Sequence, residues 1–233
     1  RMIGNPVLNP YLVMEHPDRV VLNIDNLDEL ERVIRLAGWR QPKRPLKICF
    51  RLNPLGSSGQ WPKFGISLDE LRIAAGLVME NRNLRWAGVH FHSSWNQTPE
   101  NQVRNIKLIA RFLKERFNVA ELGNLEFIDI GGGYMPEGSG SLFSSSVRGK
   151  IIEKTIEKHL RMPEMREVYK EEQVDINEFA EKIGYTLRQE LIGPLGRDDL
   201  EVWLEPGRFI SSPSTYILLG VSSVGRDRVM VDG

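Results

Sequence analysis

The sequence has little that would place it in an oxidising compartment, in a membrane or on nucleic acid. It holds one cysteine in 233 residues, and a lone cysteine forms no internal disulfide framework, so we expect a reducing, cytoplasmic setting. It has no apolar run long enough to span a bilayer and no basic-then-apolar signal segment at its start. Its 31 basic residues balance 31 acidic ones, which leaves no net field for nucleic acid or an anionic membrane. A small molecule is therefore the expected partner.

What the sequence does contain is a regular alternation of strand and helix patterns. Short apolar runs predict six strands, at residues 2–3, 20–24, 46–52, 86–91, 125–130 and 201–204. Stretches with apolar residues at helical spacing open with the capping signals Asn26, Ser67, Thr98 and Asp175. We expect Gly38 to end the first of these helices. This alternation predicts an α/β protein whose parallel strands are joined by helical crossovers.

Two architectures share this rhythm, the open doubly wound sheet and the (β/α) barrel. Residues suited to chemistry stand at the ends of four different strands, at Arg51, His92, residues 131–133 and residues 205–208. A closed barrel brings that many strand ends around one small ligand. We therefore favour a partial (β/α) barrel of the TIM type over residues 1–210, lacking its first strands. Residues 211–233 lose the helical partners and are expected to begin a C-terminal β domain.

The ends of the chain and one internal stretch suggest a larger context. The chain opens at Arg1 into a short apolar strand and closes on the apolar run at residues 229–231, so both ends read as interior positions of a longer protein. Residues 138–146 are rich in glycine and serine and have little to bury. They are either an exposed lid or an insertion without function.

The residues at the strand ends point to a phosphate and a ring. Three consecutive glycines, Gly131, Gly132 and Gly133, form either a tight turn or a backbone nest whose N–H groups close on an anion. A carboxylate at Glu205, at the end of an apolar strand, needs a cation or a proton donor. A protonated pyridine nitrogen is such a partner, and the flat imidazole of His92 can stack on the same ring.

Five motifs follow one another along the chain. They are Arg51-Leu52-Asn53-Pro54, Lys63-Phe64-Gly65-Ile66, Gly88-Val89-His90-Phe91-His92, Ile128-Asp129-Ile130-Gly131-Gly132-Gly133-Tyr134 and Glu205-Pro206-Gly207-Arg208. Any one motif is weak, but five in order with compatible spacing are specific. Together they resemble the pyridoxal-phosphate-dependent amino-acid decarboxylases of the alanine-racemase-like fold, the group of the diaminopimelate, ornithine and arginine decarboxylases.

The resemblance implies a role for each matching residue and a reaction. In the family, the histidine matching His92 stacks on the pyridoxal 5'-phosphate ring. The glutamate matching Glu205 pairs with the pyridine nitrogen, and the arginine matching Arg51 lies beside the ring. The implied reaction is the decarboxylation of an amino acid, diaminopimelate or a basic amino acid, in a homodimer and without a metal. The residues expected to hold the cofactor phosphate are Gly131, Gly132, Gly133, Gly207, Arg208 and Ser94.

Two departures from the family pattern leave an alternative open. The lysine that carries the cofactor in this family belongs to a strand earlier than Arg1, and Lys63 lies in a different motif, so we expect this chain alone to be inactive. Residues 93–97 also differ from the family, and Trp95 is placed to crowd the site. The alternative is a noncatalytic barrel homologue that binds a phosphate ligand or a protein partner. For the glycine motif, we expect Gly132→Val to weaken cofactor retention while the protein stays folded.

Overall fold

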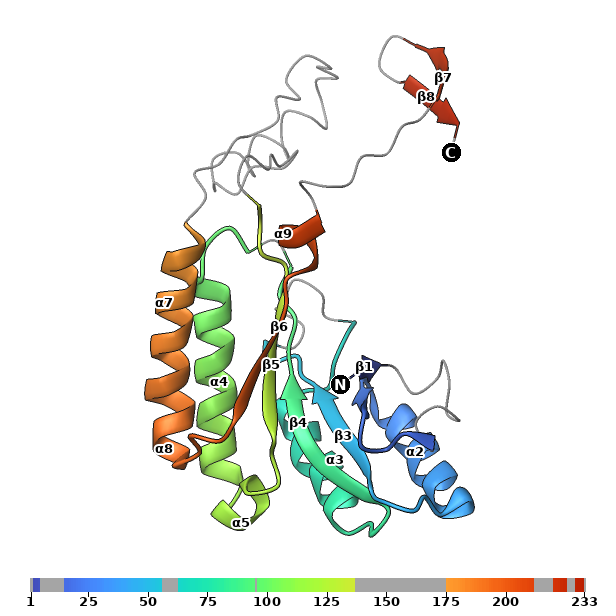
Figure 1. The fold of residues 1–233 in the computed structure, drawn as a ribbon, viewed down its shortest axis with the longest axis vertical. Coiled ribbons are helices and arrows are strands. Elements are labelled where there is room, and N and C mark those ends of the chain that lie inside the picture. The colour runs from blue at the N-terminus through green and yellow to red at the C-terminus, as the bar shows by residue number, and fades with distance from the viewer. Residues whose placement is uncertain are drawn as a thin grey trace. The chain divides into compact units, whose positions relative to one another are not determined.

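The computed structural model describes residues 2–4, 15–55, 63–94, 96–136, 175–211, 220–225 and 229–232. The chain divides into two compact units, residues 1–134 with 174–207 and residues 135–173 with 208–233. The first unit holds one sheet of six parallel strands (Figure 1). Its strands are β1 (Met2–Gly4), β2 (Val20–Ile24), β3 (Leu46–Arg51), β4 (Leu84–His90), β5 (Phe127–Gly132) and β6 (Glu201–Glu205).

The order of the strands separates the two candidate architectures. A doubly wound sheet reverses its strand order at a switch point, whereas a (β/α) barrel keeps the order of the sequence. The six described strands pair in sequence order from β1 to β6, and every pair is parallel. The prediction of a partial (β/α) barrel is therefore confirmed.

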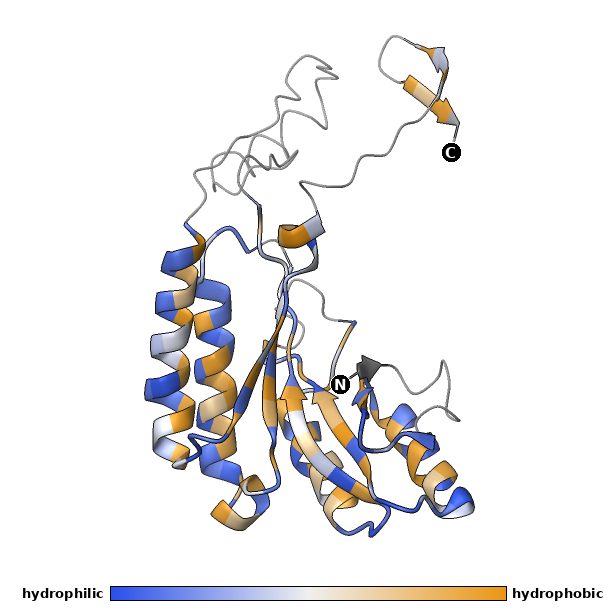
Figure 2. Ribbon diagram, in the orientation of Figure 1, coloured by the Kyte–Doolittle hydropathy of each residue, from blue (hydrophilic) through white to orange (hydrophobic). Residues whose placement is uncertain are grey.

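The helices of the first unit lie along the sheet in the same order as the strands (Figure 1). Contacts run from α2 to α3, from α3 to α4 and from α4 to α7, as expected when successive right-handed crossovers share one face. Figure 2 shows hydrophobic residues along the central strands and in stripes on these helices. The helical elements described in this unit are α2 (Leu27–Arg40), α3 (Leu68–Met79), α4 (Glu100–Arg116), α5 (Val119–Leu122), α7 (Ile176–Leu187), the π-helical turn η3 (Arg188–Ile192) and α8 (Gly193–Leu195). The short helix α9 (Gly207–Ser211) begins at the last residue of this unit.

The helix ends agree with the predicted signals except at the start of α4 and the end of α2. Thr98, predicted to cap α4, is not its N-cap, because Pro99 holds that position with helical backbone angles and without a side-chain capping bond. Ser67 and Glu70 form the full reciprocal capping box at the start of α3. Gly38, predicted to end α2, lies inside that helix, which continues to Arg40. The left-handed cap falls on Gln41 instead, at φ 46°, where its N–H bonds the Ala37 carbonyl oxygen. The prediction for Gly38 was wrong because glycine also accepts helical backbone angles when the capping bond forms further on.

The sheet buries apolar side chains on both of its faces. On the helix side, Trp86 packs between Phe50 and Phe117, with ring centroids 6.3 and 4.9 Å away. The other face carries a cluster drawn from five successive strands, which we call the apolar layer, and in it the Phe127 and Trp203 rings stack 3.7 Å apart at 3°. Its members are Val21, Cys49, Ala87, Phe127 and Trp203.

The second unit is described at fewer positions. It contains the antiparallel hairpin of β7 (Gly220–Val224) and β8 (Val229–Asp232). Residues 138–146, with the predicted lid or insertion, lie outside the described residues, as does Trp95. Among the helices that the structure describes, none combines the length and the apolar character needed to cross a bilayer.

Candidate active site at the carboxyl ends of the strands

A polar layer follows the apolar layer at the carboxyl ends of the strands. Residues two apart on a strand share a face, and four of its members stand two residues beyond the apolar member of the same strand. The β4 member stands three residues beyond, because the pairing of β3 with β4 shifts register at Ile48 and Cys49. The polar layer therefore takes one side chain from each of five strands: Asn23, Arg51, His90, Asp129 and Glu205.

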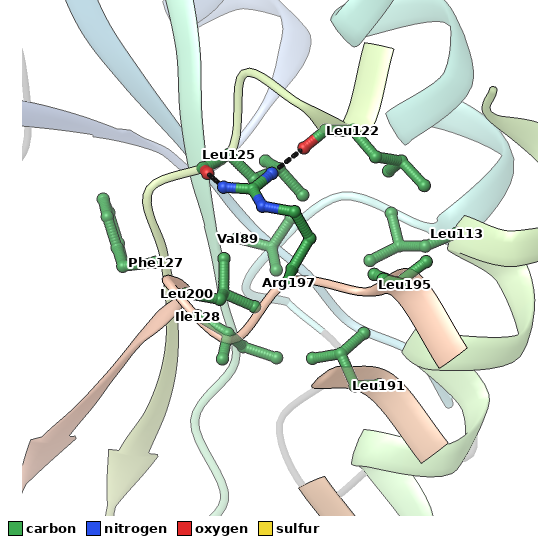
Figure 3. Close-up of a pocket in the computed structure, with 10 residues that line it drawn as sticks. All are labelled: Val89, Leu113, Leu122, Leu125, Phe127, Ile128, Leu191, Leu195, Arg197 and Leu200. Atoms are coloured by element: carbon green, nitrogen blue, oxygen red, sulfur yellow. Dashed lines mark hydrogen bonds between the residues drawn. The ribbon is translucent and has the colours of Figure 1, made fainter. Parts of the chain in front are cut away.

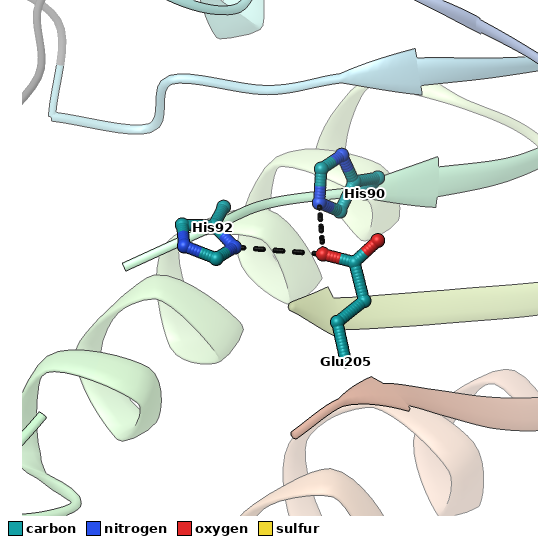
Figure 4. Close-up of side chains that lie close together, drawn as sticks. All are labelled: His90, His92 and Glu205. Atoms are coloured by element: carbon teal, nitrogen blue, oxygen red, sulfur yellow. Dashed lines mark ion pairs between the residues drawn. The ribbon is translucent and has the colours of Figure 1, made fainter. Parts of the chain in front are cut away.

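Glu205 is held between two imidazoles. Its Oε2 atom lies 3.6 Å from His90 Nε2 and 3.5 Å from His92 Nδ1, and both rings point at the carboxylate (Figure 4). His90, which contributes most, and His92 lower the pKa of the Glu205 carboxyl well below its ordinary value, against the effect of burial. The carboxylate is therefore ionised at neutral pH. The three donor atoms, all within 4.8 Å of one another, are also of the types that bind divalent metals.

The groups behind Glu205 are buried. The His90 side chain is 5% exposed, against 30% for His92, and its Nδ1 atom lies 2.9 Å from Asn23 Nδ2. Asp129 is 1% exposed and accepts the Gly131 N–H at 2.8 Å. Burial raises the pKa of Asp129, and burial together with the charges of Asp129 and Glu205 raises the pKa of the Cys49 thiol. The thiol of the apolar layer is therefore protonated and unreactive.

The three glycines close against the neighbouring strand ends. Gly131 and Gly133 have φ values of 67° and 83°, which other residues rarely adopt. A Cβ atom on either would overlap a carbonyl oxygen of the segment after β4, and a Cβ on Gly132 would overlap the carbonyl oxygen of Glu205. Valine at position 132 must therefore displace β6 locally. The expectation that Gly132→Val weakens cofactor retention while the protein stays folded remains a prediction.

A buried amide ties the segment after His92 to the glycines. Asn96 Nδ2 donates to the carbonyl oxygens of Ser93, at 2.6 Å, and Gly132, at 2.8 Å, and its backbone N–H bonds Gly133 at 2.9 Å. The hydroxyl of Ser93 accepts from Asn105 Nδ2 at 2.9 Å. Ser94, the predicted phosphate ligand, is half-buried in this segment. Its contact with a phosphate stays a prediction.

Arg51 and Lys63 take part in other contacts. Arg51 Nη1 lies 3.5 Å from Asp25 Oδ1, and its guanidinium carbon lies 4.7 Å from the centre of the Phe64 ring. Asp25 in turn accepts the Gly65 N–H at 3.1 Å, which holds the segment of the second motif beside the end of β3. Lys63 is exposed, with Nζ 5.0 Å from the Phe64 ring. This position agrees with a structural role for Lys63.

The fifth motif runs from one unit into the other. Gly207 is exposed and begins α9, two residues beyond Glu205. Arg208 belongs to the second unit, where its Nη1 donates to Met135 Sδ at 3.2 Å. The roles of both residues toward a phosphate stay predictions.

Sequence reasoning brought Glu205 and His92 together correctly but missed the residues that surround them. His90 was quoted in a motif without a role, and Asn23, Asp129 and Asn96 were given none. The period of two along each strand was the available signal for Asn23 and Asp129, since it places them on the face of Glu205. The bulge between β3 and β4 hides the same signal for His90.

An apolar cavity elsewhere in the first unit is too small to be a second site. Apart from Arg197 its lining is apolar, and its volume is about 10 Å³, barely the room of one water (Figure 3). Arg197 bonds the carbonyl oxygens of Leu122 and Leu125 at 2.6 and 2.5 Å. This guanidinium holds the turn after α5 against the core. The lining residues are Val89, Leu113, Leu122, Leu125, Phe127, Ile128, Leu191, Leu195, Arg197 and Leu200.

A sequential parallel sheet with its polar groups at the carboxyl ends defines the class of (β/α)-barrel proteins that bind ligands at that edge. Within this class, residues 11–212 match the family described as pyridoxal-dependent decarboxylase, pyridoxal binding domain. The chain belongs to this family. The predictions of the family and of pyridoxal phosphate as its cofactor are confirmed.

Individual relatives agree with this assignment. The chain is 26% identical over 235 residues to a diaminopimelate decarboxylase of Methanothermobacter thermautotrophicus, covering 95% of this chain and 45% of that protein. It is 28% identical over 144 residues to a biosynthetic arginine decarboxylase of Citrifermentans bemidjiense, covering 58% of this chain and 22% of that protein. The chain thus spans less than half the length of the curated relatives that it matches.

Solved structures share the fold. The diaminopimelate decarboxylase of Helicobacter pylori complexed with L-lysine superposes with a TM-score of 0.61 at 20% identity, covering 93% of this chain and 53% of that chain. The lysine/ornithine decarboxylase of Vibrio vulnificus complexed with cadaverine gives a TM-score of 0.56 at 22% identity, covering 91% and 44%. At these identities the likeness concerns the fold.

Proposed function

We propose that this chain is the cofactor-binding part of a pyridoxal-phosphate-dependent decarboxylase that acts on an amino acid. The observation that carries the proposal is the ionised carboxylate of Glu205 at the carboxyl ends of the strands, facing His90 and His92. An anionic group there stabilises a protonated pyridine nitrogen. Membership of the family supports the same activity.

The residues present fit the cofactor at both of its ends. For the ring, Glu205 offers a carboxylate that is 39% exposed and therefore accessible. For the phosphate, Gly131 and Gly133 leave the strand end without side chains, which allows an oxygen to approach the backbone there. Both observations concern this chain's own atoms and agree with the roles that the family motifs imply.

Each residue of the site has a proposed task. Glu205 holds the proton on the ring nitrogen, and His92 supports one face of the ring. Arg51, tied to Asp25, keeps a cation beside the ring. When bound, pyridoxal phosphate supplies an electron sink for the charge that remains at the α-carbon as carbon dioxide leaves. The three glycines, Gly207, Arg208 and Ser94 hold the phosphate.

The substrate, the assembly and the location belong to the same proposal. We assign diaminopimelate or a basic amino acid as the substrate, because the relatives named above are diaminopimelate and arginine decarboxylases. A homodimer is proposed from the family resemblance. The cytoplasm is proposed because the single cysteine is buried and unpaired.

The proposal is tested on the full-length protein. Pyridoxal phosphate is added, the complex is reduced with borohydride, and the modified peptide is identified by mass spectrometry. Release of carbon dioxide is then measured from diaminopimelate, arginine, ornithine and lysine. We expect the cofactor to be trapped on a lysine and one of these substrates to be decarboxylated. A protein that traps no cofactor and releases no carbon dioxide would instead be the noncatalytic homologue.

A further inference from the structure

His90 has a position that the roles proposed so far leave unused. It ends β4, its side chain is almost fully buried, and it faces Asn23 on one side and Glu205 on the other. Within the described part of the chain, its Nε2 atom forms no hydrogen bond of good geometry. The group that this atom faces is the Glu205 carboxylate, at 3.6 Å (Figure 4).

The contact with Asn23 determines where the imidazole carries its proton. Asn23 Nδ2 is a donor, so His90 Nδ1, 2.9 Å away, must accept. A neutral imidazole has one donor and one acceptor, which leaves the proton on Nε2. Asn23 therefore turns the N–H of His90 toward Glu205.

We propose that Asn23 and His90 form a positioning pair that fixes the orientation of the Glu205 carboxylate toward the ring nitrogen of the cofactor. This role rests on the proposed function. His90 is the fixed partner because it is buried and anchored from behind by Asn23. His92 is 30% exposed, and its proposed place is against the face of the ring. Within the described residues, these two histidines are the ion-pair partners of Glu205.

The pair suits the task because it keeps the carboxylate anionic. A neutral N–H donor stabilises an anion without bringing a positive charge that would repel the protonated ring nitrogen. A lysine or arginine in the place of His90 would neutralise Glu205 and weaken that attraction. The His90 imidazole is buried on a strand and cannot turn away into solvent, so the Glu205 carboxylate keeps one orientation.

The first measurement uses the full-length protein without cofactor. Nitrogen-15 NMR of labelled histidine reports which ring nitrogen of His90 carries the proton. We expect a protonated Nε2 and an unprotonated Nδ1, and we expect the Nε2–H signal to shift in Glu205→Gln. A proton on Nδ1 would overturn the proposal, since Asn23 would then face the ring with its oxygen.

The second measurement compares variants. His90→Leu removes the donor and should raise the dissociation constant for pyridoxal phosphate about 10-fold, the loss expected for one hydrogen bond to a charged group. His90→Gln places an amide N–H near the position of Nε2 and should recover most of this affinity. His16→Leu, at an exposed histidine outside the site, is the matched control and should bind as the wild type does.

The outcomes separate this role from the proposed function. A wild-type protein that binds no pyridoxal phosphate overturns the proposed function, and the role of the pair with it. A wild type that binds the cofactor while folded His90→Leu binds it equally well overturns the role of the pair alone. Melting temperatures of all variants identify any loss that comes from unfolding.

Discussion

Gly132 is the position where a single methyl group should disturb the site most. Its backbone lies so close to β6 that an added Cβ would overlap the Glu205 carbonyl oxygen and come within 3.5 Å of Glu205 Cβ. Its φ is not among the positive values, so the effect of Gly132→Ala is steric. Overpacking of this kind costs about 1–3 kcal/mol. At roughly 2–4 °C for each kcal/mol in a chain of this size, the melting temperature should fall by about 2–12 °C.

The same substitution should also weaken the site. The carbonyl of Glu205 has to retreat by something on the order of 1 Å, and a catalytic group misplaced by that much can lose about 100-fold in rate. On the proposed pairing of Glu205 with the ring nitrogen, cofactor affinity should fall as well, because the carboxylate moves. Thermal unfolding and pyridoxal phosphate titration of the full-length variant measure the two effects separately.

Two helical glycines serve as matched controls. Gly76 in α3 and Gly184 in α7 have nothing within 4 Å of an added Cβ. Alanine at either position should raise stability by about 0.5–1 kcal/mol, because glycine inside a helix costs conformational entropy. The reasoning is refuted if Gly132→Ala melts at the wild-type temperature and binds the cofactor with unchanged affinity.

Three further predictions follow from single contacts. Folding lowers the pKa of the Glu205 carboxyl, so this group stabilises the folded protein at pH values above its unfolded-state pKa of about 4.3. The stabilisation is lost as the pH falls through the lower folded-state pKa. In urea unfolding, the difference in stability between the wild type and Glu205→Gln should therefore shrink from about pH 5 downward. Asn96→Ala removes a donor from the buried carbonyl oxygen of Ser93 and one of the two side-chain donors to the carbonyl oxygen of Gly132, the other being Gln102 Nε2. It should cost about 1–3 kcal/mol in the same assay, and equal stability would contradict these contacts. Ser67→Ala removes the capping box of α3 and should cost about 1 kcal/mol, with a helix signal in circular dichroism that melts earlier.

The sequence allowed the architecture to be predicted because strand and helix signals are local. All six strands of the sheet were expected near their observed positions, and the capping box at Ser67 was expected as it stands. The choice of a barrel depended on where the chemistry-bearing residues fall along the strands. Glu205, His92 and the glycines were found this way, since each follows an apolar run directly.

The partners of these residues could not be found in the same way. The contact of Asn23 with His90 joins β2 to β4 across 67 positions of sequence, and the pairing of His90 with Glu205 joins β4 to β6. Such contacts depend on the register of the strands and on the bulge between β3 and β4, and a local sequence pattern predicts neither. Gly38 shows that a local signal can also be wrong. The glycine predicted the end of α2, but the capping hydrogen bond forms three residues later, from the Gln41 N–H.

The polar layer also has a consequence for how the protein reaches its native state. Its five members come from the five strands β2 to β6. Asn23 in β2 and Glu205 in β6 are the outermost members of the layer. A shift of one residue in the register of any strand would turn the polar side chain of that strand to the other face of the sheet. The layer therefore forms only when distant strands pair in the correct register, and a local hairpin or helix cannot form part of it. Contacts of such long range form slowly. The cofactor should therefore bind during refolding only when the last strand has reached its native register. The absorbance change of the cofactor on binding would then report the completion of folding.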